Sequence, residues 1–344
     1  MKYTYQGKPL IAEVDIYHDA IPYLAGISMH DFFMDKVACA RAWREGTAYL
    51  KDYFGDMLPM RRPSPAPLSY GHMICLGAPV NIPKEGEPNV SHFADSIDEA
   101  IDIMKANKDT QFEKNEFFQY YLEVWDYLKS QFPDENIPFG GFGAQGPLTS
   151  AVLLRGQDFL MDLYDEPEKC KEFLTLLTDS IIAYQKLLRR INGKPEVQES
   201  GGIADDFSSL VPPAMWYDFV LPFLNREYEA LSYGTKRSLH LENLTPKHLP
   251  LLTHLKLTHF QPSVSDMLTL DSMKQNLNPD IPFDWLLYAY HVTNMNEAEI
   301  QAWVDNTIAA GCRYLRTQFG TYACQIGKLD RIKMFLHAFD KYAQ

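Results

Sequence analysis

Along most of the chain, strand-like runs of apolar residues alternate with segments whose apolar residues have helical spacing. From about residue 137 to the end, short β-like runs that end in Gly, Asn or Asp are followed by amphipathic segments. This rhythm is typical of βα units and a parallel sheet. The pattern predicts an α/β fold with candidate strands over residues 137–142, 196–203, 237–241, 255–261, 285–291 and 313–319.

Three helices have clear boundary signals. One begins at residues 165–168, where Pro in the first turn and acidic neighbours suit a helix N-terminus, and it ends near Gly193. A second carries a capping-box pattern, Asn294 followed by Glu297, and a third begins near Asp330. Apolar residues recur at steps of three and four in each, so each helix is expected to bury one face.

The first 130 residues have a weaker pattern. A helical stretch covers residues 30–54 and a Pro-rich loop covers residues 60–67. The length of 344 residues fits one α/β barrel of roughly 250 residues with an extension. We therefore expect a single domain over 1–344, with an N-terminal extension and loop over about 1–68 before most of the barrel.

Composition and charge narrow the function. The chain is 46% hydrophobic and 22% charged, which indicates a folded protein, and its net charge of -13 argues against binding nucleic acid. No apolar run approaches the roughly 20 residues that span a bilayer, and the first residues lack a signal-peptide pattern. The five cysteines are an odd number at scattered spacings, which suits free thiols in a reducing compartment. We expect a cytoplasmic protein without a membrane partner.

The strand over residues 237–241 leads into a candidate metal site. Its apolar and polar residues alternate, so His240 and Glu242 project from the same face at the strand end. Imidazole nitrogen and carboxylate oxygen both bind zinc, and three protein ligands leave one position open for substrate. A buried hydrogen-bonded His–Glu pair is the alternative that this short motif leaves open.

A cysteine is the candidate for the third zinc ligand. Cys312 and Cys324 are both close to the last predicted strand. Cys312 follows Gly311 on the side where a strand begins, and in barrels that side usually serves stability rather than catalysis. Cys324 is therefore favoured as the third ligand.

Further carboxylates and imidazoles are predicted at the same rim. Glu199, Asp205 and Asp206 are expected to terminate one strand, and His259 and His291 lie in two others. Each lone histidine is more often a core or surface residue than a ligand. Their number nevertheless favours a functional site where the strands end.

Several motifs resemble the uroporphyrinogen decarboxylase superfamily over about residues 70–344. They are Gly-Pro-Leu-Thr at 146–149, Leu-Arg-Gly at 154–156, Asp-Glu-Pro-Glu at 165–168 and the strand that ends in Asp-Asp-Phe at 205–207. His240-Leu241-Glu242-Asn243 falls where the methyltransferase branch carries H-x-C-G, and Cys324 falls near the late cysteine of that branch. The resemblance implies a TIM (β/α)8 barrel.

For this branch the resemblance implies methyl transfer between a small methylated donor or acceptor and a corrinoid (methylcobalamin) on a partner protein. Zinc would be held by His240, Glu242 and Cys324. Asp205 or Asp206 would position the substrate or a histidine behind the metal, and Glu199 is a further candidate for the general acid.

Aromatic residues close to the predicted strand ends suggest a substrate class. They make up 13% of the chain, and Phe260 and Tyr290 join His259 and His291 as candidate substrate-binding residues. An aromatic wall would suit a methoxylated ring and an O-demethylase activity, although such residues more often belong to a core. Assembly as a homodimer is left open.

The sequence departs from the family pattern at two places, and these departures leave alternative functions open. Glu242 replaces a zinc cysteine, which implies a site richer in oxygen or another metal preference. The arginine-rich N-terminal signature of the decarboxylases is missing, and Arg61-Arg62 matches it only poorly. A metal-free decarboxylase is therefore the second hypothesis, and a non-catalytic binding subunit is the third.

Overall fold

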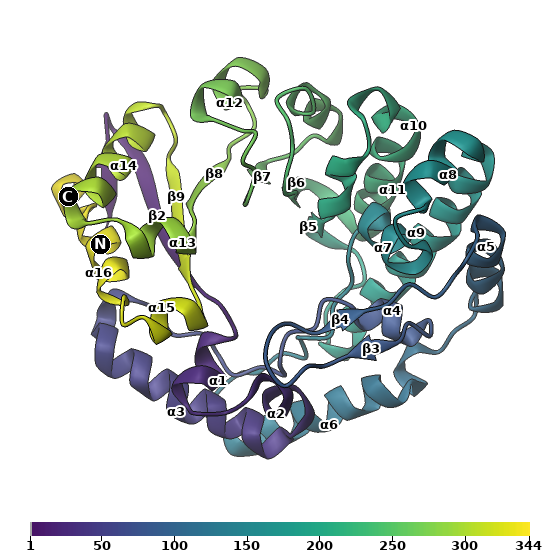
Figure 1. Cartoon of the computed structure of the whole chain (residues 1–344), viewed down its shortest axis with the longest axis horizontal. Coiled ribbons are helices and arrows are strands. Elements are labelled where there is room, and N and C mark those ends of the chain that lie inside the picture. Colours follow the sequence, from purple (N-terminus) through teal and green to yellow (C-terminus); the bar gives the residue numbers. More distant parts are fainter. Residues whose placement is uncertain (1) are drawn as a thin grey trace.

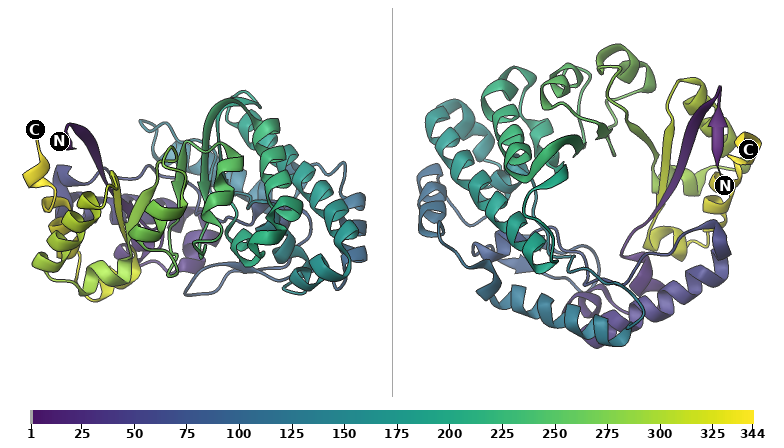
Figure 2. Two further views of the ribbon diagram at one scale, coloured as in Figure 1. Left: turned by 90° about the horizontal axis from the view of Figure 1, so that it is seen from above. Right: turned by 180° about the vertical axis from the view of Figure 1, so that it is seen from behind.

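The computed structural model describes residues 2–344 as a mixed α/β protein. Its strands and helices form a ring around a central opening, and the two ends of the chain lie together on one side (Figures 1 and 2). Among residues 2–344, no helix has both the length and the apolar character needed to cross a membrane.

Two sheets supply the inner wall of the ring. The first has the order β1-β2-β9-β8, and its strands are β1 (Tyr3–Tyr5), β2 (Lys8–Ile16), β9 (Tyr314–Phe319) and β8 (Asp284–Leu287). The second has the order β5-β6-β7, with β5 (Gln198–Ala204), β6 (Ser232–His240) and β7 (His259–Gln261). All neighbours except the β1–β2 pair are parallel, and a bridge between Phe260 and Phe283 links the sheets. A separate antiparallel pair joins β3 (Val80–Asn81) to β4 (Asn89–Val90).

Helices cover the outside of this wall. The first half of the chain contains α1 (Ala20–Leu24), α2 (Met29–Met34), α3 (Lys36–Phe54), α4 (Gly71–Cys75), α5 (Ile97–Ala106), α6 (Glu116–Gln131), α7 (Pro147–Arg155) and α8 (Phe159–Asp165). The second half contains α9 (Pro167–Ile191), α10 (Trp216–Phe219), α11 (Leu221–Leu231), α12 (Leu270–Asn276), α13 (Ala289–Asn294), α14 (Glu297–Ala309), α15 (Thr321–Gln325) and α16 (Asp330–His337).

The helix predictions are confirmed with two corrections. Helices α9 and α16 begin where the sequence indicates. The capping box of α14 is formed by Asn296 and Glu299, two residues later than expected, because the sequence offers both registers. The stretch over 30–54 is two helices, because Asp35 leaves the helical conformation and caps α3 through its carboxylate.

The strand predictions are confirmed for β5, β6 and β9, confirmed in part for β7 and β8, and wrong for residues 137–142. Residues 137–142 form no regular strand, because Gly141 adopts a φ of 80° that breaks an extended run, and only Phe142 makes a bridge, to Leu68. The candidate over 255–261 shortens to β7, and the candidate over 285–291 turns into α13 at Ala289. Strand β2 was not predicted as a strand of its own.

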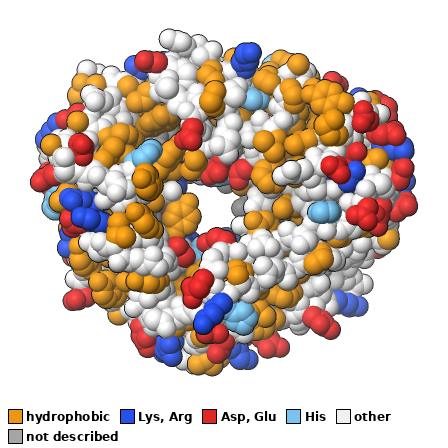
Figure 3. Space-filling view, viewed as in Figure 1, with side chains coloured by type: hydrophobic (Ala, Val, Ile, Leu, Met, Phe, Trp, Pro, Cys, Tyr) orange, Lys and Arg blue, Asp and Glu red, His pale blue; other side chains and the backbone are white. Residues whose placement is uncertain are grey.

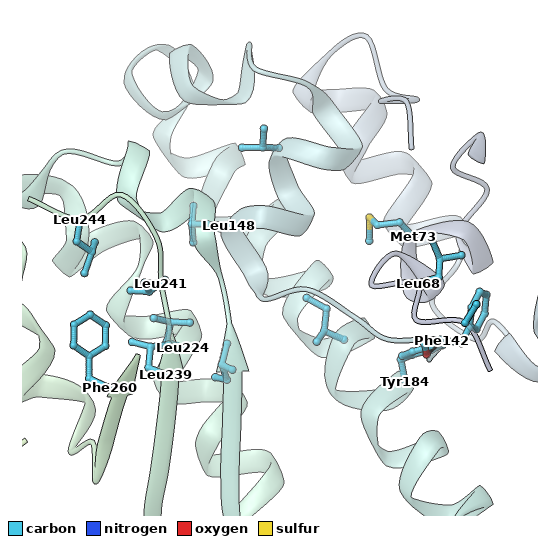
Figure 4. Close-up of a cluster of buried hydrophobic side chains, with 14 of the residues drawn as sticks. Leu68, Met73, Phe142, Leu148, Tyr184, Leu224, Leu239, Leu241, Leu244 and Phe260 are labelled. Carbon is cyan, nitrogen blue, oxygen red and sulfur yellow. Dashed lines mark hydrogen bonds between the residues drawn. The ribbon is translucent and has the colours of Figure 1, made fainter. Parts of the chain in front are cut away.

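Apolar side chains fill the space between the strands and the helices. Figure 4 shows one cluster that extends from Leu239, Leu241 and Phe260 to Leu148. These four side chains are at most 1% exposed. Because side chains alternate along a strand, burial of Leu239 and Phe260 on the helix side turns their neighbours toward the central opening.

Candidate functional site

A cavity of about 610 Å³ lies at the centre of the ring. Residues of β2, β6, β7 and β9 and of the loop over 57–61 line it. Figure 3 shows acidic side chains around this central opening. The site is therefore built from the inner faces of strands that are far apart in the sequence.

His240 occupies the last position of β6 and faces two carboxylates. Its Nε2 atom lies 3.4 Å from Asp206 Oδ1 and 3.7 Å from Glu242 Oε1. All three side chains are roughly 30% exposed, so they are open to the cavity and to a ligand. The structure thus brings His240 and Glu242 together as predicted and adds Asp206.

The two carboxylates are held in place by further hydrogen bonds. The Glu242 backbone N–H donates to Asp206 Oδ1 at 3.2 Å, and the Ser263 hydroxyl donates to Glu242 Oε1 at 2.9 Å. Burial raises the pKa of Asp206 to about 6; the Glu242 carboxylate adds to this rise and His240 opposes it. Asp206 can therefore carry or release a proton near neutral pH, as a general acid requires.

The opposite wall carries an ionic network from β2, β8 and β9. Arg316 donates to Asp284 at 2.6 Å and also contacts Asp15. Burial alone would raise the pKa of Asp284, but hydrogen bonds from His259 and Arg316 lower it. Burial raises the pKa of Glu13, and the nearby Asp15 carboxylate adds to this rise. The wall therefore holds more carboxylates than it can neutralise with Arg316.

Gln261 connects this network to His240. Its side-chain Nε2 donates to Asp284 Oδ2 at 3.3 Å, and its Oε1 contacts His240 Nδ1. His240 and Gln261 are register partners on β6 and β7, which explains why their side chains meet. A continuous chain of polar contacts thus runs from Arg316 to His240.

Asp205 faces away from the cavity although it is adjacent to Asp206. It is completely buried, and its carboxylate accepts hydrogen bonds from the backbone N–H groups of Leu148 and Thr149 at 3.3 and 2.7 Å. The Ser208 hydroxyl donates to the same carboxylate at 2.7 Å. These contacts cap the start of α7, so Asp205 connects β5 to that helix.

Glu199 lies at the other end of β5. The expectation that it terminates the strand is wrong, because β5 begins at Gln198, whereas Asp205 and Asp206 follow its last residue, Ala204. The Glu199 side chain is exposed and pairs with Lys236 at 2.9 Å. Its position gives no support to a role as general acid.

The four residues predicted to bind substrate are placed differently from one another. His259 lies 3.5 Å from Asp284 and belongs to the ionic network. Phe260 is fully buried against the helices, because it alternates with His259 and Gln261 along β7. Tyr290 and His291 are exposed on α13. None of the four lines the described cavity, and their roles stay predictions.

Three side chains can hold zinc only if their donor atoms converge on one point. Zinc lies about 2.1 Å from each ligand, so three donor atoms of a tetrahedral site stand about 3.4 Å apart. Cys324 is instead placed in α15, where burial raises the pKa of its thiol to about 12 and Asp19 adds to the rise. Among residues 2–344, no three His, Cys, Asp or Glu side chains are arranged to hold a metal ion.

The set His240, Glu242 and Cys324 therefore does not fit zinc as the side chains lie, and it stays a prediction. The rival Cys312 is buried just before β9, with its thiol directed at the carbonyl of Tyr314 at 3.3 Å. Cys312 therefore lies where β9 begins, as the sequence predicts.

Several residues of the cavity were missed from the sequence. They are Glu13, Asp15, Tyr17, His18, Arg61, Gln261, Ser263, Arg316 and Gln318. The signal for the first three was present, because polar residues alternate with Ala12, Val14 and Ile16 in a pattern typical of a half-buried strand. The same alternation marks Arg316 and Gln318 on β9.

Comparisons with known proteins identify a family and a fold. A family model described as uroporphyrinogen decarboxylase (URO-D) matches residues 73–276. Among solved structures, a methyltransferase from Methanosarcina mazei is similar, with a TM-score of 0.67 and 14% identity over 97% of this chain and 94% of that chain. At this low identity the likeness establishes the fold alone. A comparison with curated proteins gives no match.

Proposed function

The chain belongs to the uroporphyrinogen decarboxylase family, and from this premise we propose that it is a methyltransferase that moves a methyl group between a small methylated compound and a corrinoid protein. The observation that carries the proposal is the contact of His240 with Asp206 and Glu242, where His240 and Glu242 line a cavity with an excess of carboxylates. The similarity in fold to a methyltransferase is consistent with it.

We also infer that the strands form a (β/α)8 barrel. The support is the parallel order of the strands, their covering helices and the bridge that links the two sheets at Phe260 and Phe283. In such a barrel the strand ends that carry His240 and Asp206 are the catalytic face.

The charges of the cavity favour methyl transfer over porphyrinogen decarboxylation. A porphyrinogen carries several carboxylates, and each needs a free cation or a strong donor. Within residues 2–344 the lining contains Arg61 and Arg316 and no lysine. Arg316 already binds Asp15 and Asp284, and Arg61 donates to the Ile16 carbonyl at 2.8 Å. A neutral or cationic small molecule suits this wall better than a polyanion.

Several segments that follow the strands carry exposed apolar side chains. They follow the carboxyl ends of β2, β5, β7, β8 and β9 in the chain, and they are Tyr23, Leu210, Met267, Tyr290 and Tyr322. In a barrel the carboxyl ends of the strands meet at one face, and exposed apolar residues on such a face suit contact with another protein. This arrangement supports a corrinoid protein as the partner.

In the proposed reaction the side chains of the chain control a proton. The bond between the methyl carbon and a heteroatom of the substrate breaks, and the electron pair stays on the heteroatom. Asp206 donates the proton that the heteroatom requires, and Glu242 and His240 orient the Asp206 carboxyl group. A corrinoid presented by the partner would supply the nucleophile that accepts the methyl group.

The proposal is tested by incubating the purified protein with free cob(I)alamin and one methylated compound at a time. Methoxylated aromatics, methylamines and methanol form the panel, and methylcobalamin is followed by its absorbance. We expect at least one compound to be demethylated by the wild type. Turnover of a porphyrinogen with no methyl transfer would favour the decarboxylase, and inactivity in both assays with tight binding to another protein would favour a binding subunit.

The zinc prediction has a test of its own. Elemental analysis of the wild type is compared with His240→Ala and Cys324→Ala, with Cys312→Ala as the matched control. If the predicted ligands converge on zinc, the metal is near-stoichiometric in the wild type and falls in the first two variants only. Zinc that is unaffected by Cys324→Ala would remove Cys324 from the ligand set.

A further inference from the structure

Gln261 has two neighbours with different hydrogen-bonding abilities. The Asp284 carboxylate, which Arg316 holds at 2.6 Å, can only accept hydrogen bonds while it is ionised. The amide group of Gln261 must therefore turn its NH2 toward Asp284, where the contact is 3.3 Å. Its carbonyl oxygen is then left facing His240 Nδ1.

This orientation decides where His240 carries its proton. A carbonyl oxygen accepts a hydrogen bond and cannot donate one, so His240 Nδ1 must be the N–H nitrogen. In the neutral imidazole the other nitrogen, Nε2, then presents a lone pair. Nε2 is the atom that faces Asp206 at 3.4 Å and Glu242 at 3.7 Å.

We propose that Gln261 is a positioning residue, which transmits the orientation of Asp284 to His240 and fixes the tautomer of His240 with the proton on Nδ1. Nε2 is then the nitrogen that meets ligands in the cavity. Together with the Glu242 carboxylate, and with Asp206 when that carboxyl is ionised, it forms a group of acceptor atoms only. A ligand that is held there supplies a positive charge or a hydrogen-bond donor.

The experiment reads the tautomer directly and needs neither substrate nor corrinoid. The full chain is labelled with 15N at histidine, and two-dimensional NMR spectra that link the ring nitrogens to the ring protons are recorded as the pH is raised until His240 is neutral. The signals of His240 are assigned by their loss in His240→Asn. We expect a protonated Nδ1 and an unprotonated Nε2 in the wild type.

Three variants separate positioning from simple structural damage. Gln261→Leu removes the acceptor, and we expect the proton to move to Nε2 in some or all molecules. Gln261→Glu keeps an acceptor oxygen at the same distance along the side chain, so it should restore the Nδ1–H form. Gln318→Leu is the matched control, because Gln318 lines the same cavity but interacts with Tyr17, and the His240 signals should keep their wild-type pattern.

Two results would overturn the proposal. One is a wild-type His240 with its proton on Nε2 in the neutral form, or with both protons retained up to pH 10. The other is an unchanged Nδ1–H form in Gln261→Leu. The wild-type spectrum decides the matter even if a variant fails to fold, and it is independent of whether methyl transfer is found.

Discussion

The core around His72 and the cavity around His240 use the same side chain in opposite ways. His72 is fully buried between Phe112 and Tyr184, and its single hydrogen bond joins Nε2 to the Ser180 hydroxyl at 2.8 Å. Burial lowers the pKa of His72 to about 3, so it stays neutral and packs like an aromatic ring. His240 is instead surrounded by carboxylates and an amide. Burial and polar partners together therefore distinguish a packing histidine from one that can take part in chemistry.

The carboxylates show the same division. Asp205 and Glu227 are buried, whereas Asp206 and Glu242 are each about 30% exposed beside His240. Asp205 satisfies its burial with hydrogen bonds, but Glu227 Oε2 has no hydrogen-bond partner within the described part of the chain. The contrast predicts that substitutions in the cavity change activity and that substitutions in the core change stability.

The largest effect is expected for Asp206→Asn. The amide cannot donate the carboxyl proton, so we expect kcat/KM for methyl transfer to fall by about 10² to 10³, equivalent to about 3 to 4 kcal/mol. The melting temperature should change little, because the side chain is partly exposed. A fall in stability with unaltered kinetics would show that Asp206 has a structural role like that of its neighbour Asp205.

A stabilisation that depends on pH is expected for Glu227→Gln. Burial raises the pKa of Glu227 from 4.5 to about 8, so between these values the folded protein keeps a proton that the unfolded chain releases. The stability of the wild type therefore falls as the pH rises through this range, by up to about 1.4 kcal/mol per unit.

Glutamine keeps the size of the side chain without this proton. Chemical unfolding should show the variant more stable than the wild type by about 3 kcal/mol at pH 7, with the two proteins converging toward pH 4.5. A difference that is constant across the range would mean that Glu227 is ionised in the core.

A smaller loss of stability is expected for Asp205→Asn. Only one oxygen remains to accept the hydrogen bonds of Thr149, Leu148 and Ser208, and its charge is lost. We expect the free energy of unfolding to fall by about 1 to 3 kcal/mol, with kcat retained in the folded fraction. Loss of kcat without loss of stability would place Asp205 in the chemistry instead.

The smallest effect is expected for Glu199→Gln. Its exposed ion pair with Lys236 is screened by water, so the melting temperature should stay at the wild-type value. The rate of methyl transfer should also be unchanged, since Glu199 lies at the opposite end of β5 from Asp206. A strong loss of activity would restore the general-acid role first assigned to it.

The sequence predicted the parts of the site that lie next to strong local patterns. His240, Glu242 and Asp206 follow recognisable strands, and the structure brings them together. Alternating polar residues mark the strands of Asp15 and Arg316, but nothing local shows that these two strands are neighbours, so their contact could not be predicted. The distinction between Asp205 and Asp206 was also inaccessible, because it depends on the direction in which the chain turns after β5.

The pairing of β2 with β9 gives the protein a late step in its biosynthesis. Asp15 and Arg316 are 301 residues apart, so at 5 to 20 residues per second a ribosome makes the second about 15 to 60 s after the first. During that time the acidic strand has no guanidinium to neutralise it. The region that matches the family model, residues 73–276, is made before β9, so the cavity wall that β9 supplies is completed only after that region has been synthesised.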